Sequence, residues 1–564
     1  MRPFRDSSAL IPLLASLLLG AAVVGFRETP PPGAVNSQDG RSAGMSPVTE
    51  EWEALGITLD ELVLDNGFRI VIVEDHRVPR VAASLWYRVG ALQEGPGEHG
   101  ATHFLEHVIH QGTTTIGVRD PELDRRLLEE IHELEAEFLA ERNIARNQVR
   151  ERRIFFDEEA WPTTPRMDSL QARILELEER QSENRHFWQE YNWYREAGGI
   201  MRHTDPVPAN TGNELMRIEV DLPRERLELL FRMEADRMVN AVLRGFEAQR
   251  TIVLEQFLNI NRSETGRFSE ALNGASGIVH PIYLHPGGHM RDHAFWNRPS
   301  VIRMYEEYMV PNNAILALVG AVTAEEILPL AQEYFGRIPA APEPSPGMDW
   351  EAEPPPGGAI RLDWHEPLSP SLTVRYRTPG VGHPDRPAFD LVARLLGGSD
   401  GMLAAAARDL GIPSPGWSAG VSRNGSPTRL SIQARPPSDA GLPALERVVE
   451  AAVERLRRGE VDEDALTRIH EELRFQWDRL RTHRGELASD LGYFHVMDEW
   501  RTMRTFLEAR EATTVEEIQR VAARYLVPWN RIVGTTRSAP EPAAEKHLTG
   551  GPLQAGPAAP EASR

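Results

Sequence analysis

The sequence predicts an α+β fold made of two homologous halves, each a sheet backed by helices. Short apolar strands alternate with amphipathic helices along the chain. The segment Tyr308–Leu316 is echoed by Tyr525–Val533, and each follows an amphipathic helix and opens an apolar strand. Between the two copies, residues 339–358 hold seven prolines, which indicates a linker. At 564 residues, the chain is also too long for a single hydrophobic core.

The N-terminus has the character of a targeting segment. Arg2 and Arg5 precede an apolar run from Ala9 to Phe26, which predicts an export signal or an uncleaved membrane anchor. We therefore expect an exported protein, periplasmic or extracellular. The predicted segments, in order, are the signal or anchor at 1–26, a linker at 27–57, a first domain at 58–338, the proline-rich linker at 339–357, a second domain at 358–537 and a disordered tail at 538–564.

Composition excludes several classes of site. The formal net charge of -22 argues against a nucleic-acid-binding surface. The chain has no cysteine, which removes disulfides, thiolate metal sites and thiol nucleophiles. Any bound metal must therefore be held by histidine and carboxylate side chains.

The stretch from Gly100 to His110 predicts an amphipathic helix with an unusual polar face. His103 and His107 lie one turn apart, Glu106 lies beside them, and His110 follows one further turn along. Two imidazoles can hold a zinc ion while the glutamate accepts a proton from the metal-bound water. The order His-x-x-Glu-His is the inverted zincin pattern. The pentad alone can also arise by chance in a chain with 18 histidines, so the rest of the sequence has to decide.

A strongly charged region at about 120–195 interrupts the first half. Apolar residues keep helical spacing on both sides of a break at Trp161–Pro165, which predicts an antiparallel helical hairpin. The hairpin could be a dimer arm, a lid over a cleft, or an insertion without a role of its own.

Further motifs give the His-rich helix its context. Gly100–His107 is followed by Gln111-Gly112-Thr113, by Leu222-Pro223 and by Pro311-Asn312-Asn313. With these motifs, the chain resembles the insulinase/pitrilysin family of zinc metallopeptidases, which includes the mitochondrial processing peptidases, over about residues 58–537. The resemblance implies a first domain that carries the metal and a homologous second domain that helps to enclose a peptide substrate.

The resemblance also implies roles for the residues of the helix. His103 and His107 would bind Zn²⁺, and Glu106 would activate the metal-bound water for attack on a peptide carbonyl. In two-domain members of the family, pairs of chains associate. A homodimer, or a heterodimer with a homologous subunit, is therefore implied here.

The third metal ligand departs from the family pattern. The family places a glutamate on a later helix, in a segment that here reads Gln249-Arg250-Thr251-Ile252-Val253-Leu254-Glu255-Gln256. Gln256 stands at the ligand position and offers only a neutral amide oxygen, which should weaken zinc binding. Glu255 lies one residue early, about 100° around the helix. Glu255 or His110 could replace the missing carboxylate.

A second departure concerns the strand that would pair with an extended substrate. Ala209 and Thr211 fit the family's pattern for this strand and are candidate substrate-binding residues. Pro208 has no N–H group and would remove one main-chain donor from the strand edge.

Two functions follow from the sequence. The first is an exported zinc endopeptidase that hydrolyses peptides or unfolded segments, with Glu106 as the base. The second is a non-catalytic partner subunit of an active homologue, because the expected third ligand is Gln256.

Overall fold

The computed structural model describes residues 47–95, 97–151, 163–186, 191–201, 209–276, 287–288, 290–293, 296–344, 359–423 and 428–538, all of which belong to one compact unit, 46–564. The predicted export segment, Pro208, most of the proline-rich linker and nearly all of the tail lie outside these residues. Among the described residues, no helix combines the length and apolar character needed to cross a membrane.

The first sheet has eight strands, and β2 and β3 form an antiparallel hairpin whose turn is Asp65-Asn66-Gly67. Its order is β1-β2-β3-β8-β4-β7-β5, and β6 also pairs with β7. β3 runs parallel to β8, while the other pairs are antiparallel. The strands are β1 (Val48–Trp52), β2 (Ile57–Val63), β3 (Arg69–Glu74), β4 (Arg80–Tyr87), β5 (Ile200–Met201), β6 (Ala209–Thr211), β7 (Met216–Pro223) and β8 (Ala314–Gly320).

Strand β1 corrects one boundary, because residues 48–57 were expected to belong to a linker. The two glutamates of β1 disfavour a strand, but Trp52 at its end is buried and stacks on Trp500 at 5.5 Å between ring centroids. Burial of one large aromatic side chain thus outweighs the weak local preference for a strand.

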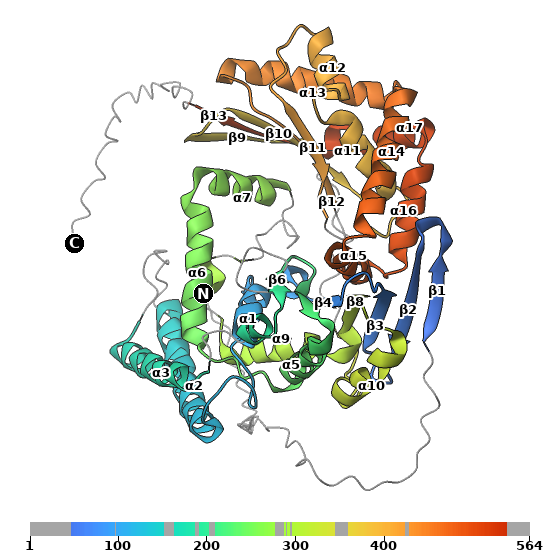
Figure 1. Cartoon of the computed structure of the whole chain (residues 1–564). Coiled ribbons are helices and arrows are strands. Elements are labelled where there is room, and N and C mark those ends of the chain that lie inside the picture. Colours follow the sequence, from blue (N-terminus) through green and yellow to red (C-terminus); the bar gives the residue numbers. More distant parts are fainter. Residues whose placement is uncertain are drawn as a thin grey trace, which may run out of the picture. The chain divides into compact units, whose positions relative to one another are not determined.

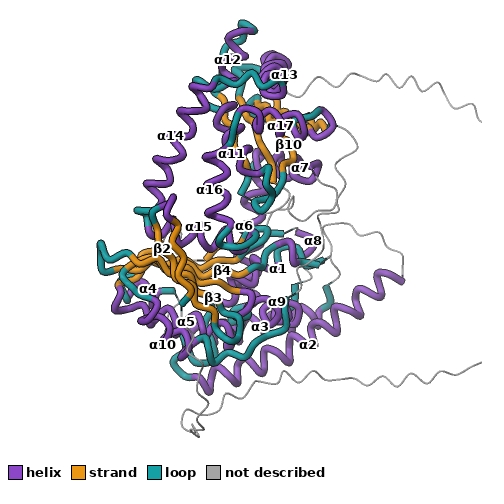
Figure 2. Tube along the Cα trace, turned by 90° about the vertical axis from the view of Figure 1, so that its right-hand side faces the viewer, coloured by secondary structure: helices purple, strands orange, loops and turns teal. Residues whose placement is uncertain are grey.

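Both faces of the first sheet are covered. Figure 2 shows helix α15 (Arg484–Met497) on one side and helices α5 (Leu227–Asn240) and α10 (Ala324–Tyr334) on the other. β4 is buried from its second residue onward, and β8 is buried throughout. Double coverage explains why these strands read as continuous apolar runs rather than as alternating patterns.

The second sheet repeats the core of the first, as the sequence repeat predicted. Its order is β11-β12-β10-β13-β9, and β9 runs parallel to β13 as β3 does to β8. The remaining pairs are antiparallel in both sheets. The strands are β9 (Ile360–Pro367), β10 (Ser371–Thr378), β11 (Trp417–Val421), β12 (Thr428–Ala434) and β13 (Arg531–Arg537). The α+β fold with two sheet-plus-helices halves is therefore confirmed.

The helices follow the predicted pattern, including the hairpin in the first half (Figure 1). The hairpin consists of α2 (Pro121–Glu151) and α3 (Pro165–Glu183), whose apolar seam contains Ile131 and Ile174. The other helices are α1 (Ala101–Ile109), α4 (Asn192–Glu196), α6 (Phe246–Arg262), α7 (Glu264–Ser276), α8 (Met290–His293), α9 (Arg298–Tyr308), α11 (Arg386–Leu396), α12 (Met402–Asp409), α13 (Leu442–Arg457), α14 (Glu463–Leu480), α16 (Thr502–Ala512) and α17 (Val515–Tyr525).

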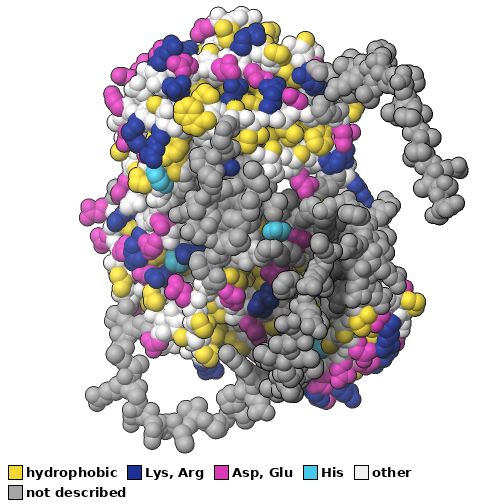
Figure 3. Space-filling view, turned by 180° about the vertical axis from the view of Figure 1, so that it is seen from behind, with side chains coloured by type: hydrophobic (Ala, Val, Ile, Leu, Met, Phe, Trp, Pro, Cys, Tyr) yellow, Lys and Arg dark blue, Asp and Glu magenta, His cyan; other side chains and the backbone are white. Residues whose placement is uncertain are grey.

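The visible surface carries both signs of charge. On the face shown in Figure 3, basic side chains are interspersed with acidic ones rather than gathered into one patch of a single charge.

Candidate active site

Helix α1 carries the two candidate ligands and the candidate base. It spans Ala101–Ile109, as the sequence predicted. The rings of His103 and His107 lie 5.0 Å apart between centroids with an interplanar angle of 73°. Both histidines are half-buried, and the side chain of Glu106 between them is buried. The structure thus places the three residues of the pentad on one face of a short helix.

A buried carboxylate fixes the start of this helix. Glu94 accepts hydrogen bonds from the backbone N–H groups of Gly100 (2.8 Å) and Thr102 (2.9 Å) and from the Thr102 hydroxyl (2.6 Å). Burial raises the pKa of Glu94 to about 7, and these three donors oppose the shift. A carboxylate at the N-terminus of a helix satisfies N–H groups that have no partner within the helix. Glu94 therefore sets the position from which His103 is presented.

Close packing leaves no room for a side chain at the helix start. Gly100 has φ +90°, and a Cβ atom there would lie 2.6 Å from the carbonyl oxygen of Gly287. Further along α1, the ring of Phe104 packs edge-on to Phe246 at 4.7 Å and stacks on Trp296 at 5.0 Å. Phe246 is the first residue of α6, so these contacts dock the His-rich helix against the start of α6.

The carboxyl group of Glu106 is held by the neighbouring strand. The hydroxyl of Thr211, on β6, donates a hydrogen bond of 2.5 Å to Glu106 Oε2. Burial raises the pKa of Glu106 to about 7, while the Thr211 hydrogen bond and the charge of Arg217 act in the opposite direction. A carboxyl group whose pKa lies near neutrality can both accept and return a proton. The sequence predicts the first of these two steps for Glu106, the acceptance of a proton from a metal-bound water.

His107 has an orienting partner on α6. Its Nδ1 lies 3.2 Å from Oε1 of Gln249, which is buried. Burial lowers the pKa of His107, and the contact with Gln249 opposes this shift. With the proton on Nδ1 donated to the amide oxygen, the Nε2 lone pair is available to a metal. Gln249 belongs to the segment in which the third ligand was expected, and nothing in the sequence predicted this contact with His107.

The remaining candidate ligands differ in burial and in surroundings. Gln256 and Glu255 are both exposed, and Glu255 lies 3.8 Å from Arg262. His110 is buried at the end of α1, where burial and the charge of Arg237 lower its pKa well below the usual range. Among the described residues, no group of three or more His, Cys, Asp or Glu side chains is placed to share a metal ion. Among the described His, Cys, Asp and Glu side chains, zinc would therefore find two ligands, His103 and His107, and no third.

The helical hairpin holds the first turn of α6. Helix α6 follows Gly245, which has no side chain to cap it. Glu178 of α3 supplies this cap, because its carboxylate accepts hydrogen bonds from the N–H groups of Glu247 (3.0 Å) and Ala248 (3.3 Å). Gln249 is the next residue along the helix. The hairpin thus positions the helix that orients His107, which is a structural role that the sequence analysis did not foresee.

A buried ion pair ties the hairpin to the loop after α1. Arg244 contacts both carboxylate oxygens of Asp124 on α2, at distances of 2.7–3.1 Å. The same guanidinium donates to the carbonyl oxygens of Gln111 (3.2 Å) and Thr113 (2.6 Å). Both partners of the pair are nearly fully buried, and the additional hydrogen bonds offset the cost of removing the charges from water.

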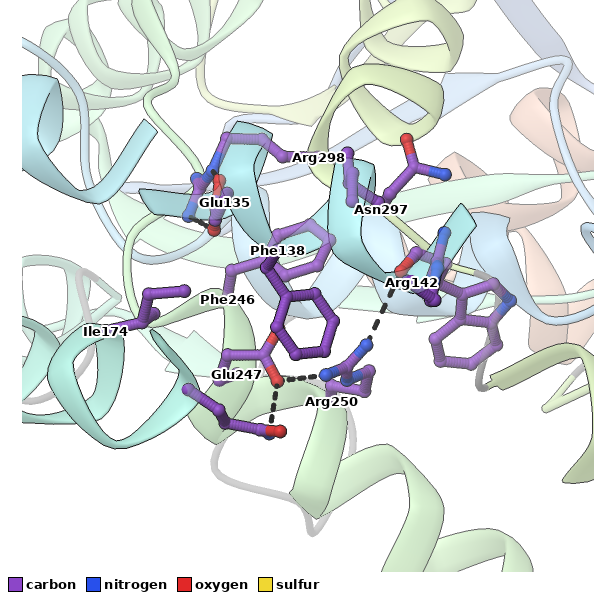
Figure 4. A pocket seen from close by; sticks show the side chains of 12 residues that line it. Glu135, Phe138, Arg142, Ile174, Phe246, Glu247, Arg250, Asn297 and Arg298 are labelled. Atoms are coloured by element: carbon purple, nitrogen blue, oxygen red, sulfur yellow. Dashed lines mark hydrogen bonds and ion pairs between the residues drawn. The ribbon is translucent and has the colours of Figure 1, made fainter. Parts of the chain in front are cut away.

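The contact between the hairpin and α6 is closely packed. Figure 4 shows the small cavity at this contact, with Glu135 and Phe138 of α2 facing Phe246 of α6. The cavity has a volume of about 30 Å³, which is too small for a peptide. Glu135 forms hydrogen bonds of 2.7 and 3.0 Å to Arg298 at the start of α9. This face of the hairpin is therefore part of the first domain's packing.

Strand β6 offers an edge beside Glu106. It pairs with β7 on one side through Ala209, Asn210 and Thr211, and no other described strand pairs with it. The candidate substrate-binding residues differ in their surroundings, because Ala209 is half-buried while Thr211 is buried against Glu106. The edge and the base therefore lie within one hydrogen bond of each other.

Comparison with known protein families finds two matching regions of the chain. Residues 69–143 match the family described as "Insulinase (Peptidase family M16)", and residues 296–473 match "Peptidase M16 inactive domain". The chain belongs to the insulinase/pitrilysin family of zinc metallopeptidases. The match to the first family description contains the His-x-x-Glu-His helix.

Similar proteins include two bacterial proteases. "Zinc protease PqqE" of Helicobacter pylori is 23% identical over 275 residues, which cover 46% of this chain and 60% of that protein. "Probable zinc protease PqqL" of Escherichia coli is 23% identical over 283 residues, which cover 49% of this chain and 23% of that protein. The matched part thus spans less than two thirds of the length of these relatives.

Solved structures share the fold. A protease from Helicobacter pylori has a TM-score of 0.65 at 17% identity, covering 85% of this chain and 99% of that one. The periplasmic protease PqqL from Escherichia coli has a TM-score of 0.61 at 15% identity, covering 92% of this chain and 52% of that one.

Proposed function

We propose that this chain is an exported zinc-dependent endopeptidase that hydrolyses peptides or unfolded segments, with Glu106 as the general base. The observation that carries the proposal is the hydrogen bond between Glu106 and Thr211. It joins a buried carboxyl group, whose pKa is raised to about 7, to the strand whose edge can pair with an extended peptide. A base beside such an edge is positioned to act at a peptide carbonyl.

The residues of α1 divide the work of hydrolysis. His103 and His107 would hold Zn²⁺, which when bound supplies Lewis-acid polarisation and a lowered water pKa. Glu106 accepts the proton of the attacking water and returns it to the leaving amine, with Thr211 holding one of its carboxylate oxygens. Gln249 keeps the ring of His107 in one orientation through Nδ1. Strand β6 would align the peptide by main-chain hydrogen bonds.

Export and association complete the proposal. The charged and apolar N-terminus supports export, and one structural neighbour is described as a periplasmic protease. A homodimer, or a heterodimer with a homologous subunit, is proposed from the family resemblance. Each half of the chain supplies its own sheet, and a partner chain would add further walls around a bound peptide.

The purified chain and a Glu106→Gln variant test the proposed activity. Both are incubated with a mixed peptide library, with zinc added, then with a chelator, and then with zinc restored. We expect new peptide termini, detected by mass spectrometry, from the wild-type chain only, and we expect them to disappear and return with the metal. Products that are equally abundant with the variant would refute the proposal.

A second function is favoured by one specific observation. Gln256 and Glu255 are exposed, and no third acidic or imidazole ligand joins His103 and His107 among the described residues. This supports a non-catalytic subunit that binds substrate for an active homologue. The bound zinc content separates the two functions, because a peptidase should purify with, or take up, about one zinc per chain. Substoichiometric metal, together with activity only after a homologous subunit is added, would favour the second function.

A further inference from the structure

The second half of the chain contains a counterpart of the candidate active site. In the first half, α1 packs against strand β6 and helix α6. In the second half, α11 packs against strand β11 and helix α14, and the strand order and directions of the two sheets correspond. β11 is the end strand of the described second sheet and pairs with β12. Its counterpart in the first sheet, β6, likewise pairs with one described strand, β7. The space between α11, β11 and α14 is therefore equivalent by topology to the site around the two histidines.

This space is a cavity with an apolar floor and a charged rim. Its volume is about 570 Å³, and β11 contributes residues 419–421 to its wall. Trp477, Phe494 and Met503 line it and are buried. The side chains of Arg423 and Arg479 stand at its rim and are 63% and 50% exposed. At the start of β11, the N–H of Gly398 donates a hydrogen bond of 3.2 Å to the carbonyl oxygen of Trp417, while no described strand pairs with this edge. An apolar floor beside the rest of the edge suits one side chain of an extended peptide.

Positive charge predominates in the lining. Five guanidinium groups face three carboxylates, in a chain whose net charge is -22. The charged residues are Arg386, Arg394, Arg423, Arg479 and Arg510, with Asp390, Glu486 and Asp490. The two rim arginines each have a partner, because Arg423 contacts Asp490 at 2.7 Å and Arg479 contacts Glu486 at 3.0 Å. Arg394 lies 3.7 Å from Glu472, which is outside the lining.

The deeper arginines share a single carboxylate. Asp390 accepts a hydrogen bond of 2.6 Å from Arg386 and lies 3.6 Å from Arg510. The side chains of Arg386 and Arg510 are only 4% and 15% exposed. Burial lowers the pKa of Arg510, which shows that its charge is poorly solvated. A second carboxylate at this place would find two planar donors already in position.

We propose that this cavity binds an extended peptide segment through a carboxylate, with the peptide main chain adding to β11 and the carboxylate lying between Arg386 and Arg510. The carboxylate can be the C-terminus of the peptide or the side chain of an Asp or Glu residue. An adjacent apolar side chain occupies the floor at Trp477. The cavity shares no lining residue with the site on α1, so peptide binding here does not depend on hydrolysis at Glu106.

Three labelled peptides test the proposal in the full chain carrying Glu106→Gln, which prevents cleavage. All are apolar hexapeptides with an N-terminal rhodamine. One has a central Gln and an amidated C-terminus, the second has a central Glu and an amidated C-terminus, and the third has a central Gln and a free C-terminal carboxylate. By fluorescence anisotropy, we expect one or both acidic peptides to bind at least about tenfold more tightly than the neutral one. The tighter of the two identifies the source of the carboxylate, and equal affinities for all three would overturn the proposal.

Paired substitutions on α16 locate the binding site. Arg510→Gln should abolish the preference for the acidic peptide. Arg504→Gln, on the same helix but outside the cavity, should leave it unchanged. If Arg510→Gln does not fold, the exposed rim variant Arg479→Gln decides instead, with an expected weakening of about threefold. A preference that persists unchanged in Arg510→Gln, or an affinity for the acidic peptide that does not fall in Arg479→Gln when that variant decides, would overturn the proposal.

Discussion

The carboxyl group of Glu178 makes the stability of the chain depend on pH. It is 5% exposed, caps α6, and has a pKa raised to about 7, chiefly by burial. Because the folded-state pKa lies above the unfolded value of 4.5, the folded chain binds more protons between these values. The contribution of Glu178 is therefore fully present below about pH 4.5 and is lost as pH rises through 7.

The size of the effect follows from the shift. A single group with pKa values of 4.5 unfolded and about 7 folded lowers the free energy of unfolding by about 2.5 kcal/mol between pH 5 and pH 8. Glu178→Gln keeps one carbonyl oxygen that can accept a hydrogen bond from the N–H groups at the start of α6, but its amide does not titrate. Between pH 5 and pH 8, we expect the free energy of unfolding of this variant to fall by about 2.5 kcal/mol less than that of the wild-type chain.

Urea unfolding at pH 5 and pH 8, followed by circular dichroism, measures this difference. Glu176→Gln is the matched control, because Glu176 lies on the same helix with its side chain 57% exposed. The control should keep the wild-type dependence on pH. If Glu178→Gln also keeps it, the assignment of a buried, titrating cap to Glu178 is wrong.

Two further substitutions test the metal site and the sheet. Gln256→Glu should tighten zinc binding at least about tenfold in a competition assay with a chelating dye, because it restores an anionic ligand. The control Glu255→Gln should change the zinc affinity little. An unchanged affinity in Gln256→Glu would contradict the helix register that places Gln256 at the ligand position. Gly492→Ala should lower the free energy of unfolding by about 1–3 kcal/mol, because a Cβ atom there would lie 2.2 Å from the ring of Trp86. Gly485→Ala, on the same helix with open space around it, is the control, and equal losses in the two variants would refute the packing argument.

The sequence predicted the local parts of the site and missed those that depend on distant contacts. Spacing alone placed His103, Glu106 and His107 on one helical face, because a 3.6-residue period needs no tertiary information. Residue spacing could not predict the hydrogen-bond partner of His107. Gln249 reaches it because Glu178, on the inserted hairpin, fixes where α6 begins. No local pattern in the sequence records that contact.

Thr211 and Glu94 show the same limit. The family pattern suggested Thr211 as a substrate contact, whereas the structure directs its hydroxyl to Glu106. Glu94 stands six residues before Gly100, too far for a capping motif in the sequence, and a tight loop brings it back to the helix start. The duplicated fold was easier to predict, because the repeat at Tyr308 and Tyr525 marks equivalent places in both sheets.

The ratio of kcat/KM between the zinc-loaded wild-type chain and Glu106→Gln, on one cleaved peptide, tests the central claim most directly. The two proteins differ only at the group proposed to move the proton. We expect the ratio to exceed about 10², the usual lower bound for the loss of a general base. A ratio near one would contradict the assignment of Glu106 as the base and would favour a non-catalytic subunit.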